Sequence, residues 1–192
     1  MTEGKKVFSV YNSVLIAIFI ALITICSWIS ITIGEIPYTL QTFAIFLVGG
    51  LLGAKRGTIT VVLYILLGII GVPVFYGFTS GIVKFIPNTE TGMTGGYIIG
   101  FIFTTIIIGV FKKISINTEN RRKKNMCLFG GMLLGDIACF LFGTIWFWQF
   151  NPMHIGLIGS ITLCVLPFII PDLIKMILAL IVIDRTEKYI KI

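Results

Sequence analysis

The sequence predicts an all-α integral membrane protein, and three observations lead to this fold class: its composition, its long apolar runs and the placement of its charges. Of the 192 residues, 57% are hydrophobic and only 12% are charged, whereas an ordinary soluble domain has about 25% charged residues. These few charged residues cannot cover the surface of a globule of this size. Lipid must therefore cover much of that surface. The composition therefore disfavours a soluble enzyme, a nucleic-acid-binding protein and a disordered linker.

Apolar stretches separated by polar breaks predict a single membrane domain of six helices with both termini on the cytoplasmic side. The predicted helices are residues 10–31, 39–53, 57–72, 96–111, 126–148 and 171–188. The second and third are shorter than the ~20 residues that span a bilayer, so either their outer ends extend into structured loops or a cavity with room for a ligand opens there. Residues 74–95 are expected to form a structured outer loop. Residues 155–170, which contain Pro167, are expected to form a re-entrant or surface segment packed on protein.

The basic residues support this topology. With the N-terminus inside, all of them except Lys84 and Lys175 fall in predicted cytoplasmic segments. Lys84 lies in an outer loop and Lys175 lies within the last helix. An excess of Lys and Arg in cytoplasmic segments is the usual orientation signal of membrane proteins.

Ionisable residues inside the predicted helices indicate a ligand site, because each costs at least ~2.5 kcal/mol in the bilayer. Asp172 and Lys175 are three positions apart, so they share one helix face and can pair. They open the last helix, where free N–H groups suit a polar ligand. The alternative is a charge pair at the membrane interface. For Asp136, a functional role and a polar contact between helices are equally open.

Polar and aromatic residues near the outer face extend this candidate site. Gln41, at the start of the second helix, offers both a hydrogen-bond donor and an acceptor. Thr39 beside it is either a ligand contact or an ordinary helix cap. Tyr76 and Tyr97 belong either to an aromatic belt at the interface or to the walls of an outward-facing pocket.

Small residues recur at four-residue spacing and allow helices to approach closely in a bilayer. Most of these pairs are expected to pack within the chain; they are Gly49, Gly53 and Gly57, Gly96 and Gly100, and Gly131 and Gly135. Ala17 and Ala21 differ, because the rest of their helix is uniformly large and apolar. They form either a flat patch facing a partner or an internal packing contact.

Several motifs are absent from the sequence. It has no Gly-x-x-x-x-Gly-Lys-[Ser/Thr] phosphate-binding loop, no cluster of metal ligands and no recognisable nucleophile beside a base. We therefore expect no catalytic residues, no metal, no cofactor and no enzymatic activity. A membrane protein with a ligand site but no visible energy source either releases its ligand passively or takes energy from another protein.

Five ordered motifs resemble the BioY family, the biotin-specific substrate-binding (S) components of energy-coupling factor (ECF) transporters. The resemblance covers residues 10–185. It departs from the family pattern at Met93, where the family usually has Pro, and at Pro171, where it tends to have Gly. The motifs are Ile36-Pro37-Tyr38-Thr39-Leu40-Gln41-Thr42, the run 49–57, Tyr64 with 68–75, Thr94-Gly95-Gly96-Tyr97-Ile98-Ile99-Gly100, and Val165-Leu166-Pro167-Phe168 leading into 171–175.

The resemblance implies a multi-pass protein of the bacterial plasma membrane that binds biotin near the outer face. Asp172 and Lys175 would be biotin ligands, although the sequence leaves open which end of biotin meets Lys175. Ala17 and Ala21 would dock on a transmembrane coupling subunit, and two ATPase subunits would supply the energy. Two alternatives remain, namely an S component for thiamine or riboflavin, and a biotin carrier that works without ATPase partners.

Overall fold

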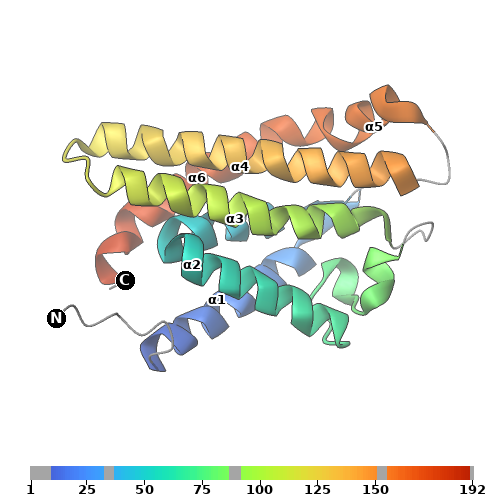
Figure 1. Ribbon diagram of the computed structural model, residues 1–192, viewed down its shortest axis with the longest axis horizontal. Coiled ribbons are helices and arrows are strands. Elements are labelled where there is room, and N and C mark those ends of the chain that lie inside the picture. The colour runs from blue at the N-terminus through green and yellow to red at the C-terminus, as the bar shows by residue number, and fades with distance from the viewer. Residues whose placement is uncertain (1–9, 33–36, 87–91, 151–154, 191–192) are drawn as a thin grey trace.

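The computed structural model describes residues 10–32, 37–86, 92–150 and 155–190, and long helices dominate it (Figure 1). In these ranges, five helical stretches are long and apolar enough to cross a membrane. The long helices are α1 (Val10–Trp28), α2 (Gln41–Ile69), α3 (Gly95–Ser115), α4 (Arg121–Phe150) and α6 (Ile169–Thr186). The shorter elements are α5 (Gly156–Cys164), strands β1 (Ser30–Thr32) and β2 (Pro37–Thr39), and the 3₁₀ turns η1 (Tyr76–Phe78), η2 (Ile82–Phe85), η3 (Gly92–Thr94), η4 (Leu166–Phe168) and η5 (Glu187–Tyr189).

Helix α2 folds back on itself at Gly53. The Gln41 side-chain amide lies 2.7 Å from the Tyr64 hydroxyl, whereas 23 residues of straight helix would separate them by roughly 35 Å. Gly53 has φ +72°, a left-handed conformation that glycine adopts without steric penalty. The segments predicted as separate helices at 39–53 and 57–72 are therefore the two arms of α2, except that Thr39 belongs to β2.

The two ends of the bundle differ in charge and structure. One end holds the start of α1, the reversal of α2, the α3–α4 connection and the end of α6, and the other holds the β1–β2 hairpin, η1 to η3 and α5 (Figure 1). The ends of elements at the first end carry most of the basic residues of the described chain. These are Lys55, Arg56, Lys112, Lys113, Arg121, Arg122, Lys123, Lys124, Arg185 and Lys188.

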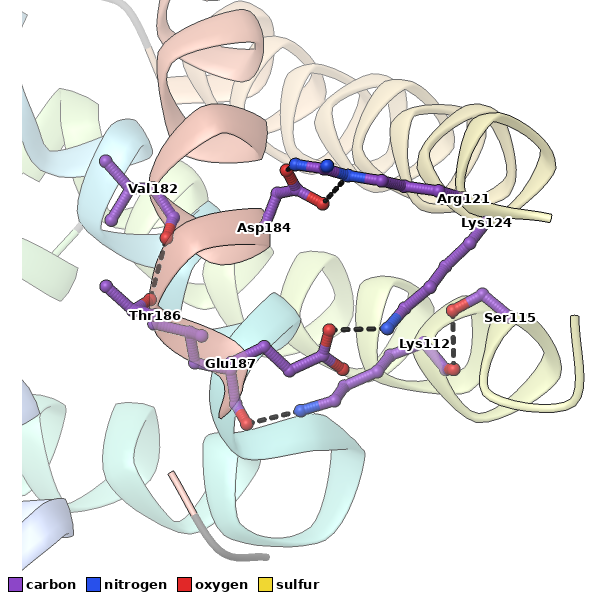
Figure 2. A network of polar contacts seen from close by, with 9 residues as sticks. Lys112, Ser115, Arg121, Lys124, Val182, Asp184, Thr186 and Glu187 are labelled. Carbon is purple, nitrogen blue, oxygen red and sulfur yellow. Dashed lines mark hydrogen bonds and ion pairs between the residues drawn. The ribbon is translucent and has the colours of Figure 1, made fainter. Parts of the chain in front are cut away.

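Polar contacts at this basic end connect α4 to the C-terminal part of the chain. Arg121 pairs with Asp184, and Lys124 pairs with Glu187 (Figure 2). Arg121 is largely exposed, and exposed ion pairs stabilise a fold by about 1 kcal/mol or less. The Arg121–Asp184 pair therefore adds little to stability beyond the helix packing.

Glycines bring the central helices into close contact. A Cβ on Gly109 of α3 would lie 2.0 Å from the backbone nitrogen of Ala54, next to the reversal of α2. Gly100 packs in the same way against the backbone of Cys139 on α4. Five of the predicted small residues also face another element of the chain; they are Gly49, Gly57, Gly96, Gly131 and Gly135.

Some element boundaries differ from those predicted, for identifiable reasons. Helix α4 starts at Arg121 rather than at residue 126, since the Asn120 side chain accepts a hydrogen bond of 2.9 Å from the Arg122 N–H and begins the helix in its polar segment. Helix α6 starts before Pro171, and proline is tolerated in a first helical turn. The segment 155–170 consists of α5, η4 and the first residues of α6. The β1–β2 hairpin was not predicted.

Candidate functional site

A cavity opens at the end of the bundle that carries the hairpin and the turns η1 to η3. Its empty space is about 720 Å³, including the open mouth. Long helices α2, α3, α4 and α6 contribute to its lining, together with β2, η1, η2 and η4. The structure brings all six predicted ligand residues to this cavity. They are Thr39, Gln41, Tyr76, Tyr97, Asp172 and Lys175.

The polar centre of the cavity is a three-residue cluster in which Thr42 joins Asp172 and Lys175. Lys175 Nζ lies 2.8 Å from Asp172 Oδ1, and it also donates to the Thr42 hydroxyl at 3.0 Å. The same hydroxyl donates to Asp172 Oδ1 at 2.9 Å. Asp172 is 2% exposed and Lys175 is 8% exposed, so both charged side chains of the cluster are buried. The first turn of α6 and the first turn of α2 thus meet through charge-assisted hydrogen bonds.

Gln41 is held by a chain of hydrogen bonds behind the cavity. Its amide donates to the Tyr64 hydroxyl at 2.7 Å, and that hydroxyl donates to the Val74 carbonyl at 2.9 Å. Ser27 of α1 donates to the same carbonyl. The Thr39 hydroxyl accepts the Gln41 backbone N–H at 3.2 Å, so Thr39 both supports the start of α2 and lines the cavity.

Tyr97 and Tyr76 lie on other walls of the cavity. The Tyr97 hydroxyl is 3.5 Å from the Thr144 hydroxyl and donates to the Cys164 carbonyl at 3.4 Å. Its ring lies against Gly143, where a Cβ would approach within 2.2 Å. Tyr97 therefore connects α3 with α4 and α5. Tyr76 belongs to η1, and the Lys84 ammonium lies 6.0 Å from the centre of its ring.

Four polar residues in the lining were not among the predicted ligand residues: Thr42, Lys84, Thr94 and Asp136. Thr42 directly follows Gln41 in the sequence, and Lys84 is the one basic residue of the predicted outer loop. Both positions could therefore have been identified from the sequence as candidate ligand residues. Asp136 is 5% exposed. Within the described ranges, its carboxylate has neither a hydrogen bond nor an ion pair. The apolar walls could not be singled out, because the chain contains 16 Phe residues.

The predicted docking residues Ala17 and Ala21 belong to α1, which contributes no residue to the lining of the cavity. Both are exposed, whereas Ile16, Phe19 and Ile23 on the other face of α1 are buried. The stripe of small residues therefore does not pack against the described part of the chain, which argues against the alternative of an internal contact. Its role as a docking surface stays a prediction.

Metal ligands are not gathered in the part of the chain that the structure describes: no group of three or more His, Cys, Asp or Glu side chains could hold a metal ion there. The four cysteines, all in the described part of the chain, form no disulfide bond, and Cys139 and Cys164 line the cavity. The single histidine, His154, lies outside the described residues.

The chain is similar in sequence to known proteins over most of its length. The chain is 36% identical over 174 residues to a probable biotin transporter BioY of Pyrococcus horikoshii, covering 90% of this chain and 94% of that protein. It is 35% identical over 172 residues to the biotin transporter BioY of Thermotoga maritima, covering 89% and 92% respectively. These relatives are named as transporters rather than as enzymes, which confirms the prediction that the chain is not an enzyme.

A solved structure agrees with this likeness over almost the whole chain. It is the crystal structure of the S-component for biotin from an ECF-type ABC transporter, with a TM-score of 0.80 and 34% identity. The match covers 98% of this chain and 95% of that one. The sequence pattern of the BioY family matches residues 2–192. On this agreement of sequence and fold, the chain belongs to the BioY family.

Proposed function

We propose that this protein binds biotin in the cavity described above and delivers it to the cell as the S component of an ECF transporter. The observation that carries the proposal is the Thr42–Asp172–Lys175 cluster inside a largely apolar cavity. The fused rings of biotin carry a urea group with two N–H donors and one carbonyl acceptor. A carboxylate such as Asp172 can accept from these N–H groups, and a lysine or a hydroxyl can donate to the carbonyl.

The burial of the cluster supports a role in binding rather than in stability. A buried ion pair often stabilises a fold no better than apolar residues of similar volume. Aromatic side chains in the lining, among them Phe140 and Phe168, suit the apolar parts of the same ligand. The Phe168 ring is stacked on the ring of Tyr38, with the centres 4.3 Å apart. A site of this kind orients a ligand through a few polar groups and holds it through apolar contact.

The proposed orientation places the cavity at the outer face of a bacterial plasma membrane. If each arm of α2 counts as one span, the chain crosses the membrane six times. The basic end of the bundle then faces the cytoplasm, as the excess of Lys and Arg in cytoplasmic segments requires. Both termini lie on that side. The first arm of α2 has only roughly 18 Å of helix, which leaves space for the ligand above it.

We also propose that the protein works with a transmembrane coupling subunit and two ATPase subunits. As the resemblance to the S components of ECF transporters implies, two separate ATPase subunits would supply the energy, and the sequence itself has no phosphate-binding loop. A transmembrane coupling subunit would contact the exposed face of α1 at Ala17 and Ala21. Close contact between helices in a bilayer depends on small residues of this kind. No cofactor is expected.

Calorimetry of the purified chain tests the proposal. Biotin should bind without ATP, while thiamine and riboflavin should produce no binding heat. Binding of another vitamin in place of biotin would refute the specificity. Uptake into liposomes by the chain alone, without coupling and ATPase subunits, would favour a self-sufficient carrier over an ECF subunit.

A further inference from the structure

The cavity contains a second buried lysine, Lys84, which the cluster around Asp172 does not use. Lys84 belongs to η2, lines the cavity and is only 7% exposed. Its ammonium lies 6.0 Å from the centre of the Tyr76 ring. The backbone beside it is fixed by close packing, because a Cβ on Gly95 would lie 2.5 Å from the Lys84 carbonyl oxygen. The Lys84 backbone is therefore held against the start of α3, whereas Lys175 belongs to α6.

Only some of the charged side chains that line the cavity form an ion pair with one another. Two acidic residues and two lysines line the cavity, and of these only Asp172 and Lys175 form an ion pair. No carboxylate of the described residues pairs with Lys84. Burial lowers the pKa of Lys84, since removing an ammonium from water disfavours its charged form. An anion brought by the ligand would offset this cost.

Lys175 is a poorer partner for such an anion. Its ammonium already lies 2.8 Å from Asp172 Oδ1. A ligand carboxylate placed there would lie close to a second carboxylate, and like charges repel strongly at such distances in a buried site. Lys84 has no carboxylate neighbour of this kind among the described residues.

We propose that Lys84 binds the carboxylate of the ligand, so that the urea ring faces Asp172 and Lys175 and the acidic chain points toward η2. This inference rests on the proposed binding of biotin. It assigns the two ends of biotin to two different lysines, and it makes Lys84 the residue that selects a ligand with an anionic chain.

A cycle that changes both the ligand and the protein tests the assignment. Biotin and biotinamide, in which a neutral amide replaces the carboxylate, are titrated by calorimetry into the wild type, Lys84→Met and the matched variant Lys175→Met. The wild type should prefer biotin by about 10- to 100-fold, as expected for a charge-assisted contact. Lys84→Met should bind both ligands with similar affinity, while Lys175→Met should keep the preference for biotin.

Each result has a defined meaning. Binding of biotinamide by Lys84→Met shows that the variant has an intact cavity, and Lys84→Arg, which keeps the charge, should retain the preference. Loss of the preference in Lys175→Met, its persistence in Lys84→Met, or its absence in the wild type would each overturn the assignment. Failure of the wild type to bind biotin at all would instead refute the proposed function.

Discussion

Thr42 and Asp172 are 130 positions apart in the sequence, and the Thr42 hydroxyl donates a hydrogen bond of 2.9 Å to Asp172 Oδ1. The same hydroxyl accepts a hydrogen bond from Lys175 at 3.0 Å. One oxygen thus contacts both charged groups of the cluster and joins the start of α2 to the start of α6. This arrangement orients the two charged side chains before any ligand arrives.

Replacement of Thr42 by Val tests this role, because valine keeps the shape and removes the hydroxyl. We expect biotin affinity to fall by about tenfold or more, since the buried side chains of Asp172 and Lys175 both lose a hydrogen-bond partner. Thr60→Val is the matched control, because Thr60 is buried on the second arm of α2 and its hydroxyl donates to the Arg56 carbonyl of the same arm. Equal affinities in both variants and the wild type would show that Thr42 does not position the site.

The charged pair itself should dominate binding. Asp172→Asn and Lys175→Ala are each expected to weaken biotin binding by about 2–5 kcal/mol, because each leaves a buried polar or charged group without its partner. The fold should persist, since the helix packing is unchanged. Near-normal affinity in both variants, measured by calorimetry, would assign the pair to structure rather than to binding.

Asp136 is the second acidic residue of the cavity and offers a contrast to Asp172. Its buried carboxylate has no hydrogen bond or ion pair within the described ranges, and such a group costs free energy of folding. Asp136→Asn should therefore raise the melting temperature of the ligand-free protein and change biotin affinity by less than about threefold, roughly 0.7 kcal/mol. A large loss of affinity would show instead that Asp136 contacts the ligand.

The sequence indicated which residues line the cavity better than it indicated how they contact one another. Asp172 and Lys175 stand out because charges are expensive in a bilayer, and the structure confirms that they pair. The part played by Thr42 depends on how closely two helix starts approach each other. Sequence spacing does not determine that distance for residues so far apart.

The elements could be predicted only as far as hydrophobicity defines them. Long apolar runs indicated the helices, but the reversal of α2 depends on the left-handed backbone of Gly53, which sequence alone could not distinguish from an ordinary loop. The first turns of α4 were missed because their residues are polar. The cue for this helix start was the side chain of Asn120 rather than an apolar residue.

Close packing between α2 and α3 can be tested at Gly109, where an added Cβ would meet the Ala54 backbone at 2.0 Å. Gly109→Ala should lower stability by about 1–3 kcal/mol, as overpacking does. Gly130→Ala in α4 is the matched control, because a Cβ there meets nothing within 4 Å and alanine favours a helix. Thermal melts should separate the two variants, and equal melting temperatures would contradict the packing argument.

The exposed stripe of Ala17 and Ala21 predicts that docking and ligand binding are separable. Leu or Trp at both positions should hold a partner helix away, because small residues are what allow helix backbones to approach in a bilayer. Neither alanine lines the cavity, so biotin affinity and the melting temperature of the isolated protein should stay at wild-type values.

Leu141→Trp, which adds bulk at an exposed position of α4, serves as the control and should leave association with a coupling subunit intact. Pull-down of that subunit measures docking, and undiminished association of the Ala17 and Ala21 variants would end the proposal. A joint fall in stability and biotin affinity would indicate instead that the stripe supports the fold.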